Sequence, residues 1–455
     1  MRKFALSLYV KYPFFSGPFN FLYKNLVTKK RYKDLVNSSV AKELIEFEYK
    51  KYSDLKSLQN IKLKKLLHHS YNNVPYYKKI FQENNITIRD IDKDPEVALK
   101  RVPKLTKQKL NENWELLQAS NISVKSTSLI TTGGSTGTPQ KFLFTSSELL
   151  VRDAHWWRWE KISGVDRISG SDRLLYIGMD KRFLENSSLP GFKASDDIYI
   201  VNPLGMSSER LNKIYEDIVK FDPTYIRGYA SASYLFATYF KGLEVKFTLK
   251  SILTSSDQLH TYMKEVIEKT FDCKVTDFYG QNEDIATAVQ CSFGNYHINM
   301  ENNLVETDEN GNIYATHLEH YFMPLLNYQV NDIGVLNKSF SCECGRSTDV
   351  FTKIIGRVDD YLIDSNGNTY SAGALNQPMK SDIGSIKEIQ YIQTDSENLI
   401  VNFVKGPDFT DRSLDELAYN ICKYTNSSFK IEFFECENSI PRLNNGKFRL
   451  IVREF

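Results

Sequence analysis

The sequence is poor in cysteine, with six residues in a chain of 455. That number is far too small for a disulfide scaffold, so we expect a reducing, cytoplasmic environment. Neither sign of charge is in excess, because 58 Lys and Arg stand against 56 Asp and Glu. The resulting net charge of +2 gives no electrostatic basis for binding nucleic acid, and we expect no nucleic-acid partner.

A long apolar run is also missing. The most apolar stretch, residues 1–27, is interrupted by Lys11 and Lys24, and it falls short of the roughly 18 apolar residues of a membrane-spanning helix. No small-residue cleavage site follows it, so a secretory signal is not expected. Two interpretations stay open for this stretch: a helix that packs on the body of the protein, or an interfacial helix that holds the protein peripherally at the inner face of the membrane.

The residues that are present suit a large globular protein, since 41% are hydrophobic and 25% are charged. Residues 40–85 have apolar positions at helical spacing, and Pro75 is expected to end that pattern. From about residue 145 to 290, short apolar runs alternate with amphipathic stretches, which predicts an α/β fold with much parallel pairing. Residues 297–355 carry more strand signals, and the tail after residue 356 has the pattern of a small α+β domain.

Residues 131–141, T-T-G-G-S-T-G-T-P-Q-K, form a glycine-rich turn between two stretches with strand character, as in a hairpin. Glycines let the backbone approach a ligand closely, and hydroxyls beside backbone N–H groups suit phosphate oxygens. The spacing matches neither G-x-x-x-x-G-K-[ST] nor G-x-G-x-x-G. From these residues alone, a plain hairpin turn and a phosphate-binding loop both stay open.

This turn resembles the phosphate-binding loop of the adenylate-forming superfamily, which includes acyl-CoA synthetases, peptide-synthetase adenylation domains and luciferases. Further segments resemble motifs of that superfamily and occur in the same order: Y-G-Q-N-E at 279–283, Y-Q-V-N-D at 328–332, G-R-V-D-D at 356–360 and N-G-K-F-R at 445–449. Residues 65–81 and 101–110 are similar to the phenylacetate–CoA ligase branch. Within that branch, the chain most resembles the CapK-type capsular polysaccharide biosynthesis proteins.

The resemblance implies that the chain binds ATP or AMP with Mg²⁺. Glu283 is the implied Mg²⁺ ligand, because a carboxylate suits a hard cation. Tyr279, beside Gly280, is implied to stack on adenine, and Asp332, helped by Arg357, to hold the ribose hydroxyls. The implied phosphate-binding residues are Thr132, Gly133, Gly134, Ser135, Thr136, Gly137, Thr138 and Lys141.

The resemblance also implies two domains. Residues 1–358 would form a large N-terminal adenylation domain, a multi-layer α/β unit with a β-rich part. Residues 359–455 would form a small, mobile α+β lid that pivots at Asp359. The lid would carry the catalytic Lys447, whose ammonium would act with Glu283 during adenylation by neutralising charge on the α-phosphate and the carboxylate.

Four residues have the composition of a metal site. Cys291 and His297 form C-x5-H, and Cys342 and Cys344 form C-x-C-G after a gap. Thiolates and an imidazole at this count suit tetrahedral Zn²⁺, and a closed set of four ligands indicates a structural site. Free buried thiols beside a core histidine remain the alternative, although some relatives in the phenylacetate–CoA ligase branch carry a similar cluster.

The implied function is an AMP-forming ligase that converts a small carboxylate to an acyl-adenylate and transfers the acyl group, within surface polysaccharide assembly. The family pattern G-x-N-x-x-P after the hinge is absent, so CoA, a sugar and an amine all stay open as the acceptor. One alternative is a phenylacetate-type CoA ligase, and another is an inactive nucleotide-binding assembly protein. The segment H-W-W-R-W-E at 155–160 suits either a sugar or acyl pocket or a packed aromatic surface. The sequence does not indicate an oligomeric state.

Overall fold

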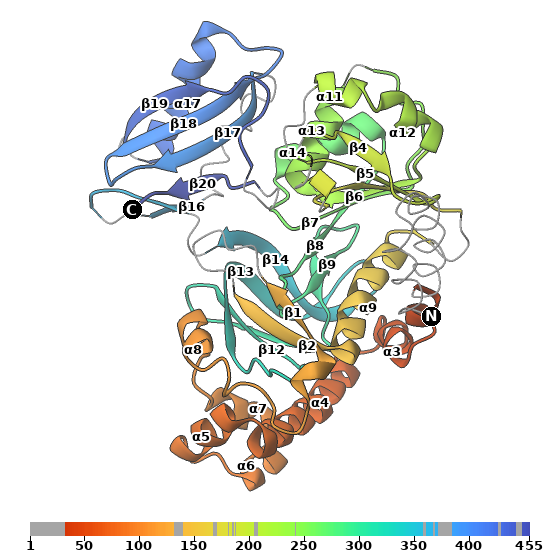
Figure 1. Cartoon of the computed structure of the whole chain (residues 1–455). Helices are drawn as coiled ribbons and strands as arrows, with labels where there is room; N and C mark the ends of the chain where they lie inside the picture. The colour runs from red at the N-terminus through yellow and green to blue at the C-terminus, as the bar shows by residue number, and fades with distance from the viewer. Residues whose placement is uncertain are drawn as a thin grey trace, which may run out of the picture.

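The computed structural model describes residues 32–455 except for 132–139, 167–170, 181, 184–185, 187, 204–207, 242, 358–360, 367–368, 372–384, 426–428 and 443–447. Figure 1 shows a large body with a small unit, drawn in blue, that contains the C-terminus. None of the helices in the described part of the chain combines the length and the apolar character needed to cross a membrane.

Helices form the lower end of the body in the view of Figure 1. The longest, α4, spans Tyr52–Asn73 and packs Leu66 and Leu67 into a core that also holds Tyr77 and Phe142. Helix α4 ends at Asn73, just before Pro75, as the sequence predicts, and a second helix, α5, begins at that proline. Proline is favoured at the first position of a helix, where its missing N–H has no intrahelical partner. The other helices of this part are α5 (Pro75–Glu83), α6 (Ile88–Lys93), α7 (Pro95–Lys100) and α8 (Lys107–Glu112), whereas α3 (Ser39–Phe47) lies near the N label of Figure 1.

The glycine-rich turn is flanked by two strands, as the sequence predicts. Strands β1 (Thr127–Thr131) and β2 (Lys141–Thr145) pair antiparallel, and Thr131 lies opposite Lys141. The loop between them, residues 132–139, lies outside the described residues. Helix α9 (Ser146–Ile162) follows directly from β2. It begins with a capping box in which Thr145 accepts from the backbone N–H of Glu148 and the Glu148 side chain accepts from that of Thr145.

A parallel sheet forms the centre of the body and confirms the α/β prediction. Its strands run in the order β5-β3-β6-β7-β8, all parallel, with β4 antiparallel at the edge beside β5. The strands are β3 (Leu174–Ile177), β4 (Gly191–Lys193), β5 (Ile198–Val201), β6 (Tyr225–Tyr229), β7 (Ser251–Ser255) and β8 (Val275–Tyr279). Chain order reverses around β3, since β5 lies on one side of it and β6 on the other.

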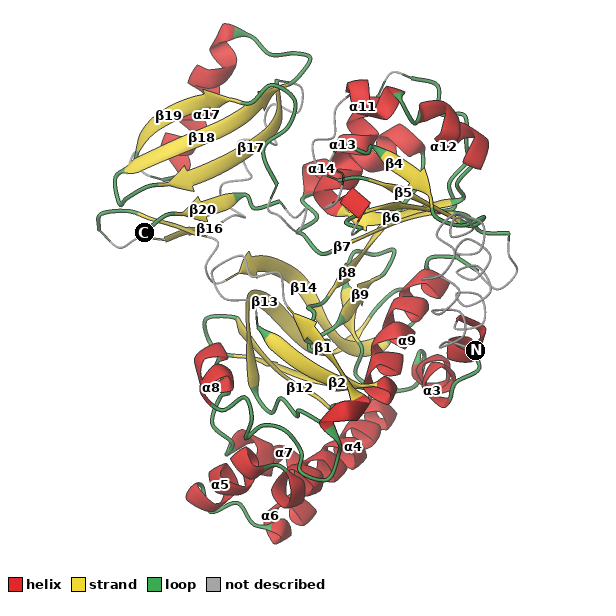
Figure 2. Ribbon diagram, viewed as in Figure 1, coloured by secondary structure: helices red, strands yellow, loops and turns green. Residues whose placement is uncertain are grey.

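Both faces of this parallel sheet are covered, which explains why its strands read as apolar runs. Leu174 packs with Trp159 of α9 on one face, and Leu175 packs on the opposite face with Phe236 and Phe271. Those two aromatic residues belong to α13 (Ala230–Phe240) and α14 (Thr261–Phe271). Figure 2 shows the short helices α11 (Ser208–Asn212) and α12 (Tyr215–Phe221) beside them.

The β-rich part continues the same sheet without a break, in the order β11-β12-β13-β14-β10-β9-β8. All of these pairings are antiparallel. The strands are β9 (Ala288–Gln290), β10 (Tyr296–Ile298), β11 (Asn303–Thr307), β12 (Asn312–His317), β13 (Tyr328–Ser341) and β14 (Ser347–Arg357). Strands β13 and β14 form the longest hairpin of the sheet, and two of the predicted nucleotide residues, Asp332 and Arg357, are register partners at its open end.

The small C-terminal unit contains a four-stranded sheet in the order β19-β18-β17-β20. It contacts the body at α13, where the hydroxyl of Tyr234 donates to the backbone carbonyl of Lys387 at 2.7 Å. The expected domain boundary at residue 358 falls within an undescribed segment. The elements of this C-terminal unit are β15 (Tyr361–Ile363), β16 (Thr369–Ser371), β17 (Ile386–Gln393), β18 (Asn398–Lys405), α17 (Asp411–Tyr424), β19 (Lys430–Glu435) and β20 (Ile451–Arg453).

Candidate active site

Two of the predicted nucleotide-binding segments meet at the end of β8. The Tyr279 hydroxyl donates to Asp332 Oδ2 at 2.7 Å, and Gln281 Nε2 lies 3.4 Å from the same oxygen. Burial and the neighbouring Asp332 carboxylate raise the pKa of Tyr279 far above its ordinary value, so the phenol stays a hydrogen-bond donor. The sequence separation of these two residues is 53 positions, so only the folded sheet brings them together.

Glu283, the predicted Mg²⁺ ligand, is nearly buried in the same loop, with an exposed fraction of 8%. The following residue, Asp284, has a positive φ of 53° and is 1% exposed. A left-handed backbone at a buried non-glycine residue is strained, so its surroundings must hold it in place. Asp284 therefore fixes the direction in which the chain leaves Glu283.

A group of buried histidines surrounds Asp284. His155 Nδ1 from α9 lies 3.5 Å from Asp284 Oδ1, and His317 Nε2 lies 3.4 Å from Asp284 Oδ2. His320 stacks on His317 with ring centroids 3.8 Å apart. Burial raises the pKa of Asp284, but His155 and His317 outweigh it and hold that pKa below its ordinary range. Sequence analysis missed this network, because its members come from three segments that share no motif.

His155, Asp284 and His317 also lie close enough together to suggest a metal site. The hydrogen bonds of His317 argue against that interpretation. The backbone N–H of Glu319 donates to His317 Nδ1 at 3.1 Å, so the neutral ring carries its proton on Nε2, the nitrogen that faces Asp284. A protonated nitrogen cannot coordinate a metal, and we interpret the group as a buried carboxylate held by imidazoles.

The Cys/His cluster predicted from the sequence is assembled in the structure. The ligand atoms of Cys291, His297, Cys342 and Cys344 all lie within 4.8 Å of one another. Cys291 Sγ and Cys342 Sγ are 3.8 Å apart, and Cys344 Sγ lies 3.3 Å from His297 Nε2. A tetrahedral Zn²⁺ with Zn–S bonds of about 2.3 Å needs sulfurs about 3.8 Å apart. The spacing of the thiols therefore fits a zinc ion.

The hydrogen bonds around His297 also fit a metal ligand, in contrast to those of His317. His297 Nδ1 lies 2.7 Å from Thr348 Oγ1, so it can donate there and leave Nε2 free toward the sulfurs. Burial lowers the pKa of His297 to about 3, which keeps the imidazole neutral. Burial raises the pKa of the Cys344 thiol to about 11, so a cation is needed to hold that sulfur as a thiolate.

Several predicted site residues lie outside the described residues or away from the cluster at Tyr279. The loop residues from Thr132 to Thr138, the hinge Asp359 and Lys447 are not described. Lys141 is exposed at the start of β2, and its backbone carbonyl accepts from Trp114 Nε1 at 2.9 Å. Arg357 is placed by its strand pairing opposite Asp332.

Removing the Asp284 charge should destabilise the protein. Asp284→Asn replaces the charged acceptor of the imidazoles by a neutral amide, and losing such buried hydrogen bonds to a charged group costs about 2 kcal/mol of the free energy of unfolding. Because the pKa of Asp284 is lower in the folded state, its stabilisation is full above about pH 4 and is lost as the pH falls further. Urea unfolding should therefore show a large difference from the wild type at pH 7 that narrows below about pH 4.

Asp272→Asn is the matched control, because Asp272 also has a positive φ, of 45°, and is exposed. Asparagine adopts that conformation readily, so this variant should unfold like the wild type. Equal stability of Asp284→Asn and the wild type at pH 7 would contradict the role given to the buried carboxylate.

Comparisons with known proteins agree with this fold and these motifs. The family model described as CapK C-terminal domain matches residues 362–454. Protein CapK of Staphylococcus aureus is 25% identical over 418 residues, which cover 88% of this chain and 89% of that protein. A crystal structure of 2-hydroxyisobutyryl-CoA ligase in the postadenylation state with 2-HIB-AMP superimposes with a TM-score of 0.66, at 16% identity, covering 87% of this chain and 89% of that chain.

A second structure of that ligase, with 2-HIB-AMP and CoA in the thioesterification state, gives a TM-score of 0.53 at 16% identity, over 90% of this chain and 91% of that chain. These comparisons confirm the resemblance drawn from the motifs. The chain has the fold of an adenylate-forming enzyme, is similar to CapK along most of its length and matches the CapK C-terminal domain model over residues 362–454.

Proposed function

We propose that this protein is an ATP-dependent ligase that activates a carboxylate as an acyl-adenylate, releases pyrophosphate and transfers the acyl group to a second nucleophile. The observation that carries the proposal is the hydrogen bond between Tyr279 and Asp332, which joins two motif segments beside the buried Glu283. The fold shared with a CoA ligase captured with an acyl-adenylate supports the same activity.

Asp332, Tyr279 and Glu283 each have a role in this proposal. The Asp332 carboxylate accepts hydrogen bonds from the ribose hydroxyls, and Tyr279 holds that carboxylate while its ring lies against adenine. Glu283 offers oxygen ligands to Mg²⁺, which would neutralise charge on the phosphates. Holding the carboxylate in line with the α-phosphate supplies much of the rate enhancement, because the two reactants then react within one complex and need not meet in solution.

Two acceptors have specific support. The resemblance to capsule-associated CapK-type proteins supports transfer to a sugar or an amine in surface polysaccharide assembly. The structure of 2-hydroxyisobutyryl-CoA ligase with 2-HIB-AMP and CoA supports CoA as the second candidate. Product analysis after adding CoA, an amino sugar or neither to the adenylating enzyme distinguishes them.

The first test is pyrophosphate exchange by the variant Lys447→Ala, measured with ATP and a panel of carboxylates. The ammonium of Lys447 would interact most strongly with the charge that develops as pyrophosphate leaves. Its removal should therefore lower exchange on the order of 100-fold or more while ATP affinity changes little. Transfer from a chemically supplied acyl-adenylate should survive, because the small domain would by then have rotated the lysine away.

Lys430→Ala serves as the control, since Lys430 lies exposed on β19 of the same small unit. It should exchange like the wild type. Full exchange by Lys447→Ala would remove that lysine from the site. Absence of exchange by the wild type with every acid would instead favour a catalytically inactive nucleotide-binding protein.

We also propose that Cys291, His297, Cys342 and Cys344 hold one structural Zn²⁺ per chain. Cys342→Ser should lose the zinc and unfold at a lower temperature, because the ion ties three separate segments together. Cys436→Ser is the control, since Cys436 lies outside the cluster and should keep both metal and stability. Elemental analysis of freshly purified protein measures the metal, and its absence from the wild type would contradict this assignment.

A further inference from the structure

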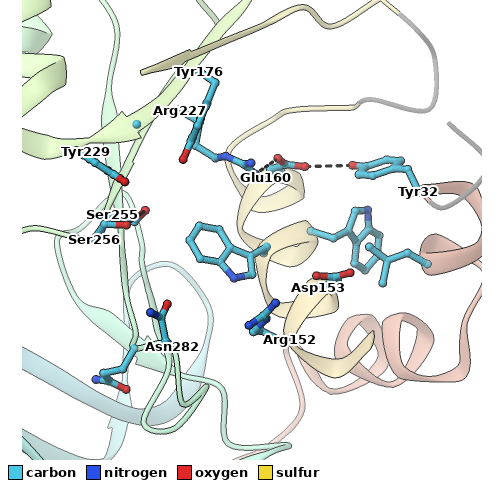
Figure 3. Close-up of a pocket in the computed structure, with 15 residues that line it drawn as sticks. Tyr32, Arg152, Asp153, Glu160, Tyr176, Arg227, Tyr229, Ser255, Ser256 and Asn282 are labelled. Carbon is cyan, nitrogen blue, oxygen red and sulfur yellow. Dashed lines mark hydrogen bonds and ion pairs between the residues drawn. The ribbon is translucent and has the colours of Figure 1, made fainter. Parts of the chain in front are cut away.

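A cavity of about 540 Å³ lies between helix α9 and the carboxyl ends of strands β3, β6 and β7 (Figure 3). Chain order reverses around β3 in this sheet, and ligand sites of such folds form at the reversal, outside the carboxyl ends of the strands. Gly228 allows strands β3 and β6 to pack closely there, because a Cβ at this position would lie 2.5 Å from the Ile177 carbonyl oxygen. The cavity therefore occupies the position where this architecture binds small molecules.

The same cavity reaches the candidate nucleotide site. Gln281 and Asn282 line it, and they belong to the loop between Tyr279 and Glu283. Gln281 Nε2 also lies 3.4 Å from Asp332 Oδ2. An acid bound in the cavity would thus be next to the nucleotide residues, as adenylation requires.

One wall of the cavity is a single face of α9. Arg152, Trp156 and Glu160 are spaced four residues apart and all line it. The Trp156 ring stacks on Phe278 at 4.7 Å, so it is held flat and contributes a rigid apolar surface. The tryptophans of H-W-W-R-W-E therefore differ in environment: Trp159 is fully buried in the core, whereas Trp156 lines the cavity.

Glu160 and Arg227 neutralise each other at one end of the cavity. Arg227 Nη1 donates to Glu160 Oε1 at 2.7 Å, and Glu160 is 2% exposed. The Arg227 guanidinium also lies 5.6 Å from the Trp156 ring and 5.7 Å from the Tyr176 ring. A guanidinium has five N–H donors, so Arg227 can donate to an uncharged ligand while its charge stays balanced.

Arg152 forms no such ion pair with any carboxylate that the structure describes, although Asp153 also lines the cavity. Arg152 is half-buried and makes no ion pair or hydrogen bond with any other residue that the structure describes. Figure 3 shows it across the cavity from Asn282, on the same side as Asp153. A guanidinium that is not already in an ion pair suits a carboxylate, which it can bind through two parallel hydrogen bonds.

The opposite wall presents hydroxyl groups. Tyr229, Ser255 and Ser256 line it at the ends of β6 and β7. Ser256 has a φ of 78°, a strained conformation that is found most often at functional sites. Ser255 Oγ and Ser256 Oγ lie 3.4 Å apart and can share only one hydrogen bond. A hydrocarbon acyl chain in this cavity would remove the remaining hydrogen-bonding groups of the two serines and of Arg227 from water without replacing their hydrogen bonds, which is unfavourable.

We propose that the carboxylate activated by this protein belongs to a small acid that carries several hydroxyl groups. Its carboxylate binds Arg152, its hydroxyls bind the Arg227 side and the serine wall, and its apolar face lies on Trp156. This inference rests on the proposed adenylating function and names the substrate class of that site. An aromatic or aliphatic acid of the same size lacks the groups that the cavity is built to bind.

The experiment compares two acids with the same ring size, glucuronate and cyclohexanecarboxylate. Pyrophosphate exchange and direct calorimetric binding in the presence of AMP are both measured on the full chain. We expect glucuronate to give kcat/KM on the order of 100-fold higher, because a site that hydrogen-bonds hydroxyls rejects an analogue that lacks them. Equal or reversed preference, or binding of neither acid, overturns the proposed substrate class.

The two measurements separate this inference from the proposed function. Exchange with cyclohexanecarboxylate alone contradicts the hydroxylated substrate and leaves adenylation standing. Tight binding of glucuronate without exchange supports the cavity assignment and contradicts adenylation of this class of acid.

Two variants test the role of Arg152. Arg152→Gln should raise KM for glucuronate about 10- to 100-fold, since a charge-assisted pair of hydrogen bonds is lost. The ratio of kcat/KM between the two acids should stay the same, because the hydroxyl-binding groups remain. Lys161→Gln, an exposed change of charge on the same helix, should leave KM unaltered. An unchanged KM in Arg152→Gln would show that this guanidinium does not bind the carboxylate.

Discussion

The carboxylate of Asp284, buried between His155 and His317, ties together the parts of the molecule on which the candidate site depends. A buried charge without partners is strongly unfavourable, so helix α9, the loop after β8 and the end of β12 must stay in contact. Asp284 follows Glu283 directly, and His155 precedes Trp156 directly. One electrostatic interaction therefore sets both the backbone of the candidate Mg²⁺ ligand and the wall of the cavity.

The long hairpin of β13 and β14 supplies a second constraint, at the other side of the nucleotide residues. Its open end carries Asp332 opposite Arg357, and its turn carries Cys342 and Cys344. Those thiols meet Cys291 and His297, which flank the turn between β9 and β10. A metal at this cluster would act on nucleotide binding only through the register of the hairpin, which is why we propose a structural role for it.

The sequence was sufficient to predict the fold class and the Cys/His cluster, because both have local signals. Parallel strands that are covered on both faces read as apolar runs, and thiols at C-x-C spacing stand out in a chain with six cysteines. The contact between Tyr279 and Asp332 is expected from the resemblance alone, since neither segment carries a local signal that the two come together in the fold. The end of α4 just before Pro75 also has a local signal, because a proline disfavours helical backbone at the residue before it.

Other features could not be predicted, since they exist only after folding. The histidines around Asp284 come from α9, a loop and the end of β12, and a lone histidine in a sequence is most often an ordinary core residue. The cavity is likewise formed by one helical face and three strand ends. Arg152 and Arg227 look alike in the sequence, and only the folded chain shows that Arg227 forms an ion pair with Glu160, whereas Arg152 forms none with any residue that the structure describes.

The central claim is that this site joins a carboxylate to the α-phosphate of ATP, and the fate of the carboxylate oxygens tests it most directly. In that reaction a carboxylate oxygen attacks phosphorus, pyrophosphate leaves, and the later attack of the acceptor on the carbonyl carbon leaves that oxygen on AMP. Mass spectrometry of the nucleotide formed from an ¹⁸O-labelled acid should find one ¹⁸O in AMP and none in pyrophosphate. Formation of ADP and phosphate, or of AMP without label, would contradict the account.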